Sequence, residues 1–270
     1  MRKTPYEKEW DALVRKETRY LKNNSEKQEF ILNRKLEERV PDKLQEKLDL
    51  AFYKGFQIVF EKGTTVIEKT YSKEKKDHAH KVDIYALELS ETRKNLRAFS
   101  RRSRLSNARN LAISLGEGVA TGIPGIGLPD IPIFIGMILK SIYEIALSYG
   151  FSYDTDGERR FILALIRTSL LKGRELESEN AAINRLIKDG VPSECSSEEL
   201  SRAIRSASDT LSQELLYLKF LQGIPIAGVI GGLSDAVYLK KITAYASLKY
   251  YRRFLTAQRN PETASSAQQP

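Results

Sequence analysis

The 270-residue sequence has few of the side chains on which enzymes most often build a catalytic centre. It contains one cysteine, Cys195, and two histidines, His78 and His80. A single thiol cannot form an internal disulfide, so nothing marks an oxidising compartment. Two histidines two positions apart on a helix point in different directions, which disfavours a shared metal ion. We therefore expect neither a bound metal nor a cofactor.

Long apolar runs are also missing. No run of about 18 uncharged apolar residues occurs, so no segment is a convincing transmembrane helix. The first residues, MRKTPYEKEWDALVRKE, lack the apolar region of a secretory signal. No phosphate-binding loop, nucleophile elbow or zinc-protease motif is present. These absences lead us to expect a cytoplasmic protein, and they identify no reaction.

Positive charge, in contrast, is abundant and unevenly placed. The net charge is +9, and residues 1–110 carry all of that excess, with 27 Lys and Arg against 18 Asp and Glu. Residues 93–109 hold no acidic residue. We expect an anion-binding surface made by Arg93, Arg97, Arg101 and Arg104, which share one helical face, and by Lys249 and Arg252. Lipid headgroups are favoured over nucleic acid because no nucleic-acid-binding motif accompanies the charge, and a solvated face is the alternative.

Periodicity predicts an all-α protein, a bundle of about 7–8 helices. Capping boxes at Thr4–Glu7 and Ser196–Glu199 open two of the helices, and Thr155 caps another. The expected helices cover approximately 4–22, 40–63, 75–117, 130–150, 155–173, 174–189, 196–221 and 233–253. The buried stripe expected for the third comprises Val82, Tyr85, Leu89, Leu96 and Phe99, followed by Leu105, Leu111 and Ile113.

Two glycine- and proline-rich segments resemble each other. Residues 122–132 read GIPGIGLPDIP and residues 223–235 read GIPIAGVIGGLSD. Both begin Gly-Ile-Pro and both contain Gly-Leu-x-Asp, which indicates a quasi-repeat of two interrupted apolar hairpins. The residues that define the hairpins are Gly122, Pro124, Gly127, Pro129, Gly223, Pro225 and Gly232. Such hairpins are either tight turns of a soluble bundle or a wedge that dips into a bilayer.

Asp130 and Asp235 are the last residues of the Gly-Leu-x-Asp motif in the two segments. A carboxylate at a helix start is usually an N-cap. If the two hairpins pack side by side, the same pair could serve as acid and base or hold a cation. These aspartates are the only weak catalytic candidates that the sequence offers. A short calcium-like run at Asp154–Glu158 lacks the remaining ligand spacing and is better explained as a helix cap.

The run GIPGIGLPDIPIFIGMILKSIYEIALSYGF (122–151), the following ERRFIL (158–163) and the late GIPIAGVIGGLSDAVYLKKITAYA (223–246) resemble the bacterial EcsC family. The resemblance spans about residues 40–255, and it implies a helical domain there. It also implies a link to an ABC transporter associated with protein secretion and processing, because the namesake is encoded beside such a transporter. No catalytic residues come with it. We expect an N-terminal amphipathic helical extension (1–39), the EcsC-like domain (40–255) and a disordered tail (256–270).

These observations favour a membrane-associated accessory protein that is peripheral to the inner face of the cell membrane. Its expected partner is an anionic membrane surface or a membrane protein complex. Two alternatives remain open at this stage. One is a hydrolase-type enzyme that uses Asp130 and Asp235, and the other is a soluble adaptor whose hairpins dock a partner helix.

Overall fold

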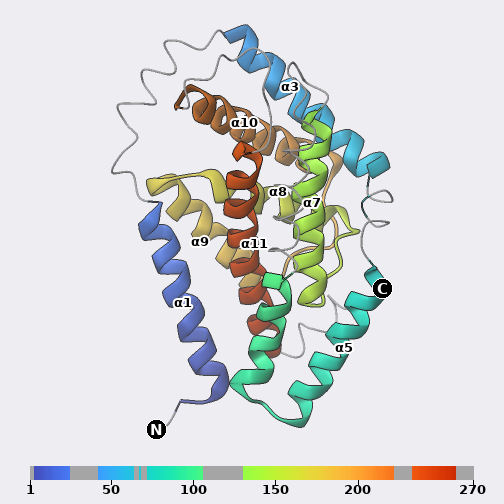
Figure 1. The fold of residues 1–270 in the computed structure, drawn as a ribbon, viewed down its shortest axis with the longest axis vertical. Coiled ribbons are helices and arrows are strands. Elements are labelled where there is room, and N and C mark those ends of the chain that lie inside the picture. The colour runs from blue at the N-terminus through green and yellow to red at the C-terminus, as the bar shows by residue number, and fades with distance from the viewer. Residues whose placement is uncertain are drawn as a thin grey trace.

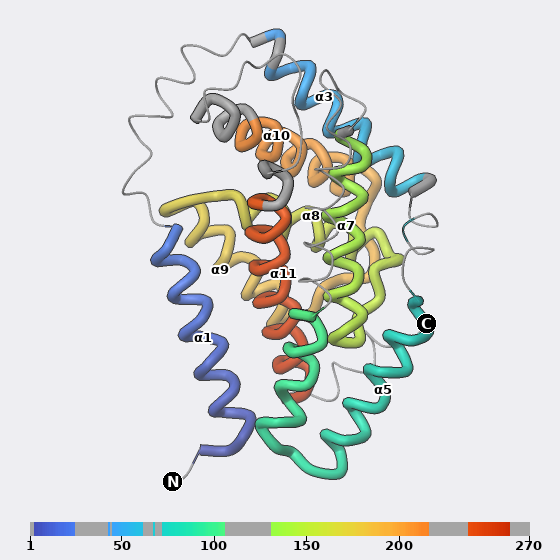
Figure 2. Tube along the Cα trace, in the orientation of Figure 1, coloured from blue at the N-terminus to red at the C-terminus, as the bar shows by residue number. Residues whose placement is uncertain are grey.

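A computed structural model describes residues 3–24, 42–63, 67, 72–105, 130–221 and 233–259, and the grey parts of Figure 2 lie outside this description. The described residues form helices without any strand, which confirms the all-α prediction. The elements are α1 (Pro5–Asn23), α3 (Asp42–Ile58), the π-helical turn η1 (Val59–Gly63), α5 (Lys73–Leu89), α7 (Asp130–Ser148), α8 (Asp156–Leu170), α9 (Gly173–Asp189), α10 (Ser197–Leu221) and α11 (Leu233–Arg259). Residues 93–105 form a further helix.

Helix α11 lies at the centre of the bundle and packs against α1, α7, α8 and α9 (Figure 1). Helix α7 lies between α11, α3 and α5, while α10 packs against α3 and α8. The core is rich in aromatic side chains. Its largest fully buried members include Phe52, Phe56, Phe99, Phe134, Tyr143, Tyr153, Phe161, Tyr245 and Tyr250. Burying so many rings supplies much of the hydrophobic stabilisation of the fold.

Helices α7 and α11 run side by side in the same direction (Figure 1). At their C-terminal ends the Tyr149 ring lies 5.8 Å from that of Tyr251 and 6.0 Å from that of Phe254. At the other end the beginning of α7 packs against Gly55 of α3. The two helix starts therefore lie at the same end of the molecule.

The helix ends follow the predicted capping chemistry. Thr4 and Glu7 form a reciprocal capping box, as do Ser196 and Glu199. The Thr155 hydroxyl accepts a hydrogen bond from the Glu158 amide, so the calcium-like run is a helix cap. Each cap satisfies amide groups that would otherwise lack partners at a helix start.

Helix α7 ends at Ser148, and the chain leaves it through a Schellman motif whose glycine is Gly150. The Phe151 amide donates to the Ala146 carbonyl and the Gly150 amide to the Leu147 carbonyl, both at 3.0 Å. Gly150 has φ +79°, a conformation that glycine adopts at little cost. The predicted helical end at this glycine is confirmed.

The prediction of one continuous helix from 75 to 117 is wrong. Helix α5 ends at Leu89 because Ser90 adopts an extended conformation, with φ −157°. The Thr92 hydroxyl then accepts a hydrogen bond from the Asn95 amide and caps the helix formed by residues 93–105. Two helices result, α5 and the helix of residues 93–105, joined by the tight connection at 90–92. This pair is called the 73–105 hairpin.

The predicted buried stripe of this region is only half right. Leu96 and Phe99 are buried, but Val82, Tyr85 and Leu89 are 52%, 62% and 69% exposed, and Leu105 is 67% exposed. Helix α5 instead buries His80 and Leu87. After the break at Ser90, the helix of residues 93–105 turns back along the protein. The side chains of Val82, Tyr85 and Leu89 on α5 therefore do not face the core.

One described helix, α7, is long and apolar enough to cross a membrane by length and composition, over Ile131–Ser148. Since 72% of that window is buried inside the protein, α7 functions here as the core helix of the bundle. Its buried Glu144 forms an ion pair with Lys76 of α5 at 3.0 Å. The polar residue is thus matched by a charge from a neighbouring helix.

Candidate functional site

Five consecutive polar residues near the end of α11, Lys249–Arg253, contact three glutamates that are buried in the fold. Glu9 and Glu17 come from α1, and Glu158 comes from the first turn of α8. The glutamates are 3%, 5% and 4% exposed. Burial of a carboxylate is costly unless partners compensate its charge, so each of these positions requires a cation or several donors.

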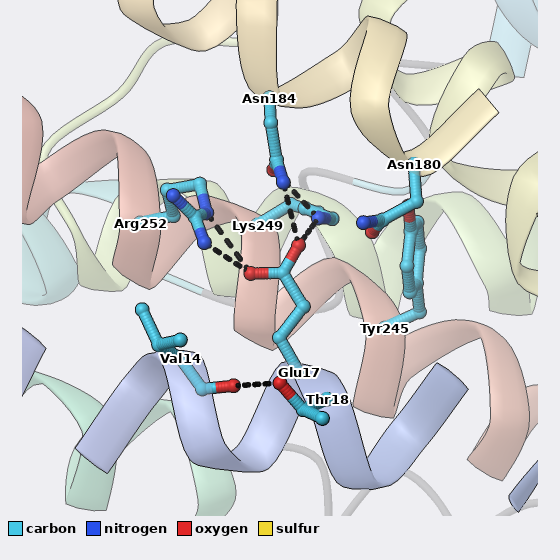
Figure 3. A network of polar contacts seen from close by, with 8 residues as sticks. All are labelled: Val14, Glu17, Thr18, Asn180, Asn184, Tyr245, Lys249 and Arg252. Carbon is cyan, nitrogen blue, oxygen red and sulfur yellow. Dashed lines mark hydrogen bonds and ion pairs between the residues drawn. The ribbon is translucent and has the colours of Figure 1, made fainter. Parts of the chain in front are cut away.

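The Glu17 cluster is the most extensive of the three (Figure 3). The Lys249 ammonium and the Asn184 amide both donate to Glu17 Oε1, the latter at 2.8 Å. Arg252 donates to Glu17 Oε2 through Nε, at 3.1 Å, and through Nη2. Lys249 also donates to Asn184 Oδ1 at 2.8 Å. Beside the cluster, the buried Tyr245 hydroxyl donates to Asn180 Oδ1 at 3.0 Å.

The charges in this cluster shift the pKa of both ionic partners. Burial by itself would raise the pKa of Glu17, but Lys249 and Arg252 together outweigh it and lower that pKa to about 2. Burial lowers the pKa of Lys249 to about 8 against the opposing attraction of Glu17. The carboxylate is therefore firmly ionised near neutral pH, while the Lys249 ammonium has lost much of its ordinary preference for the proton.

The other two glutamates have a similar arrangement. Arg253 donates to both oxygens of Glu158 at 2.9 and 2.7 Å, and the Tyr250 hydroxyl donates to it at 2.6 Å. The Arg253 guanidinium also lies 4.1 Å from the centroid of the Phe151 ring, a favourable cation–π position.

Glu9 receives hydrogen bonds from the Tyr251 hydroxyl at 3.2 Å and from Arg93 at 2.7 Å, and Arg97 lies 2.9 Å away. Burial opposes ionisation of Glu9, but these two arginines lower its pKa overall. The second helix of the 73–105 hairpin is thereby tied to α1.

These contacts change the interpretation of the predicted anion-binding residues. Lys249 is fully buried, so it cannot form the membrane-facing surface that the sequence suggested. Arg252 is only partly exposed and is bound to Glu17. Arg93 and Arg97 are partly engaged by Glu9. Arg101 and Arg104 are exposed and form no ion pair with the residues described here.

The predicted aspartate pair stays untested. Asp130 is the first residue of α7 and Asp235 lies in the first turn of α11, so both belong to helix starts at the same end of the molecule. Their side chains lie outside the described ones. The residues that define the two predicted glycine- and proline-rich hairpins lie outside the described part of the chain altogether: Gly122, Pro124, Gly127, Pro129, Gly223, Pro225 and Gly232.

The histidines and the cysteine show no catalytic arrangement. His78 is exposed, while His80 is buried against Phe99, and burial lowers the pKa of His80. Burial and the nearby Asp156 raise the pKa of Cys195, which makes its thiol less reactive. Among the described residues, no group of three or more His, Cys, Asp or Glu side chains could hold a metal ion.

A cavity of about 610 Å³ adjoins the Glu17 cluster between α1, α9 and α11. Its lining residues are Tyr6, Trp10, Asn184, Arg185, Lys188, Arg252, Thr256 and Arg259. Asn184 and Arg252 belong to both the cluster and the cavity. Sequence reasoning missed this cavity and the three buried glutamates. The available signal was Glu17, a carboxylate within the face of α1 that also buries Leu13.

The described part of the chain is thus an all-α bundle. Its C-terminal helix α11 is joined to α1 and α8 by ion pairs with buried glutamates. The sequence model of the EcsC protein family matches residues 7–255, and the chain belongs to that family. The matched region begins within α1, so it includes Glu9 and Glu17. Neither the curated proteins nor the solved structures contain a significant match to the chain.

Proposed function

We propose that this EcsC-family protein is a peripheral membrane-associated accessory protein that binds an anionic lipid surface through its helical hairpin of residues 73–105. The observation that carries the proposal is the exposure of Val82, Tyr85 and Leu89 on α5. Their spacing places them on one side of the helix. Apolar side chains at helical spacing on an outer face are typical of an interaction surface.

A lipid surface suits this hairpin because apolar and cationic side chains occur on it together. Tyrosine is favoured at the membrane interface, where its ring is buried and its hydroxyl stays hydrated. Lys75, Lys81, Lys94, Arg101 and Arg104 are all exposed on the same hairpin. Each cation near an anionic surface contributes about 1 kcal/mol, and each partly buried apolar side chain adds a similar amount.

The proposed location is the inner face of the cell membrane. A link to an ABC transporter or to protein secretion rests on family membership alone. The hydrolase alternative draws no support from the described residues, since no catalytic group has been located among them.

Vesicle flotation tests the proposal. The protein should float with vesicles containing phosphatidylglycerol and remain unbound to phosphatidylcholine vesicles. The double variant Tyr85→Ser/Leu89→Ser should lose most of that binding. Arg101→Gln/Arg104→Gln should weaken it by about thirtyfold, because two charges contribute about 2 kcal/mol.

Matched controls come from exposed residues on other helices. Lys47→Gln/Lys54→Gln removes two exposed charges from α3, and Val237→Ser removes a 55%-exposed valine from α11. Both controls should bind as the unaltered protein does. The proposal fails if the protein floats with neither vesicle, or if hairpin and control variants lose binding equally.

A further inference from the structure

The cavity between α1, α9 and α11 has the size and the charge of a ligand site. Its volume of about 610 Å³ is within the range of small-molecule pockets in proteins. Four cationic side chains line it, namely Arg185, Lys188, Arg252 and Arg259, and no carboxylate does. Like charges brought together around one cavity repel each other, so the arrangement favours an anion that lies between them.

Three of these cations lack a counter-charge. Arg185, Lys188 and Arg259 form no ion pair with any residue in the described part of the chain. Lys188 and Arg259 each lie in the last turn of a helix, where the helix dipole favours a cation. The helix dipole explains why a cation stands at each of these two helix ends. It does not explain why both helix ends meet at the same cavity, which Arg185 and Arg252 also line.

The fourth cation is held in place. Glu17 binds Nε and Nη2 of Arg252, which leaves Nη1 without a hydrogen bond among the described residues. The guanidinium lies 5.0 Å from the centroid of the Trp10 ring. Arg252 is thus oriented from two directions before any ligand arrives, and pre-ordered donors cost less entropy on binding.

The aromatic wall beside it is also fixed. Tyr6 and Trp10 stack with ring centroids 6.2 Å apart, and the Tyr6 hydroxyl donates to the Leu255 carbonyl at 2.9 Å. Arg185, Lys188 and Arg259 are exposed, whereas Tyr6, Trp10 and Arg252 are half-buried. The inner part of the cavity is therefore formed by partly buried side chains that other contacts hold in place. The exposed cations lie at its rim, where they can move to contact a ligand.

We propose that this cavity binds a ligand with a diphosphate or polyphosphate group. Arginine guanidinium groups match phosphate oxygens with paired donors, and lysine adds a point charge. Several unpaired cations suit a group that carries more than one negative charge. The phosphate is the recognised chemistry, whether it belongs to a soluble molecule or to a lipid headgroup. This inference does not rest on binding of the 73–105 hairpin to membranes.

Calorimetric titration of the full chain with inorganic pyrophosphate tests the proposal. We expect saturable one-site binding that weakens as salt is raised. The double variant Arg185→Gln/Lys188→Gln should weaken it at least tenfold, and Arg259→Gln should weaken it further. Lys47→Gln/Lys54→Gln removes the same charge from α3 and should leave the affinity unchanged. The altered side chains are exposed, so thermal melting should show that all variants are folded.

Two comparisons separate the possible sources of the phosphate. If the cavity variants lose pyrophosphate but float with vesicles that contain a polyprenyl diphosphate lipid as the unaltered protein does, the ligand is a soluble phosphate compound. If they lose both, while Arg101→Gln/Arg104→Gln retains pyrophosphate, a diphosphate headgroup occupies the cavity. Absence of saturable binding, unchanged affinity in the cavity variants, or equal affinity for citrate would each overturn the phosphate assignment.

Discussion

At the scale of single residues, neighbours within Lys249–Arg253 contact different glutamates. The reason is that a helix turns by about 100° per residue, so adjacent side chains point in different directions. Lys249 and Arg252, three positions apart, share a face and both bind Glu17. Tyr250 and Arg253 share the next face and both bind Glu158. A basic, tyrosine-containing run that resembles a surface patch in the sequence is therefore divided among three buried acids.

Removing one member of the Glu17–Lys249 pair should cost more than removing both. Glu17→Met leaves the Lys249 ammonium buried without its counter-ion, and we expect a loss of about 3–5 kcal/mol in the free energy of unfolding. Glu17→Met/Lys249→Met replaces the pair by apolar groups and should recover at least about 2 kcal/mol of that loss. Urea unfolding of the single and double variants measures both values. A double variant that is less stable than Glu17→Met would contradict this account.

At the scale of helices, local chemistry could be predicted from the sequence, and tertiary packing could not. The caps at Thr4, Thr155 and Ser196 were predicted because a cap involves only a few neighbouring residues. The break at Ser90 was missed because the apolar spacing continues across it. The exposed face of α5 was likewise predicted to be buried, since periodicity shows that a helix is two-sided and does not show which side has a neighbour.

Two glycines test how α7 packs against its neighbours: Gly136, within the helix, and Gly150, just after its end. A Cβ at Gly150 would lie 2.2 Å from His80 Nε2, and its φ of +79° is strained for any other residue. Gly150→Ala should therefore reduce the free energy of unfolding by about 2 kcal/mol or more. A Cβ at Gly136, in the middle of the same helix, would meet no atom within 4 Å. Gly136→Ala should stabilise the protein by about 0.5–1 kcal/mol.

Thermal or urea unfolding of the two alanine variants decides between these expectations. Equal effects at Gly136 and Gly150 would show that the close contact between α5 and the end of α7 is unimportant for stability. A gain at Gly136 together with a loss at Gly150 would support the packing of His80 over this turn.

At the scale of the whole molecule, α1 is joined to the C-terminal helix by ion pairs that no local pattern predicts. Glu17 and Lys249 lie 232 positions apart in the chain, and Glu9 and Tyr251 lie 242 apart. The sequence could show that these residues are charged or polar, but their pairing depends on how α1 packs against α11. The same holds for the phosphate-binding cavity, whose cations come from α9 and α11 and whose aromatic wall comes from α1.

Because Glu17 joins the two ends of the chain, its titration should be visible in the stability of the entire protein. Its pKa is about 2 in the folded protein, below the ordinary value of 4.5, so the unfolded chain binds a proton more readily between these values. The resulting stabilisation is fully present above about pH 5 and is lost as the pH falls towards 2, and in total it amounts to about 3 kcal/mol.

Urea unfolding between about pH 7 and about pH 3 should reveal this dependence. Glu17→Met/Lys249→Met lacks the titrating carboxylate and so provides the reference. By about pH 3 the unaltered protein should have lost about 2 kcal/mol more than this reference, since most of the difference in proton binding lies above that pH. Parallel pH profiles for the two proteins would mean that Glu17 titrates normally in the fold, and hence that its contacts with Lys249 and Arg252 are weak in solution.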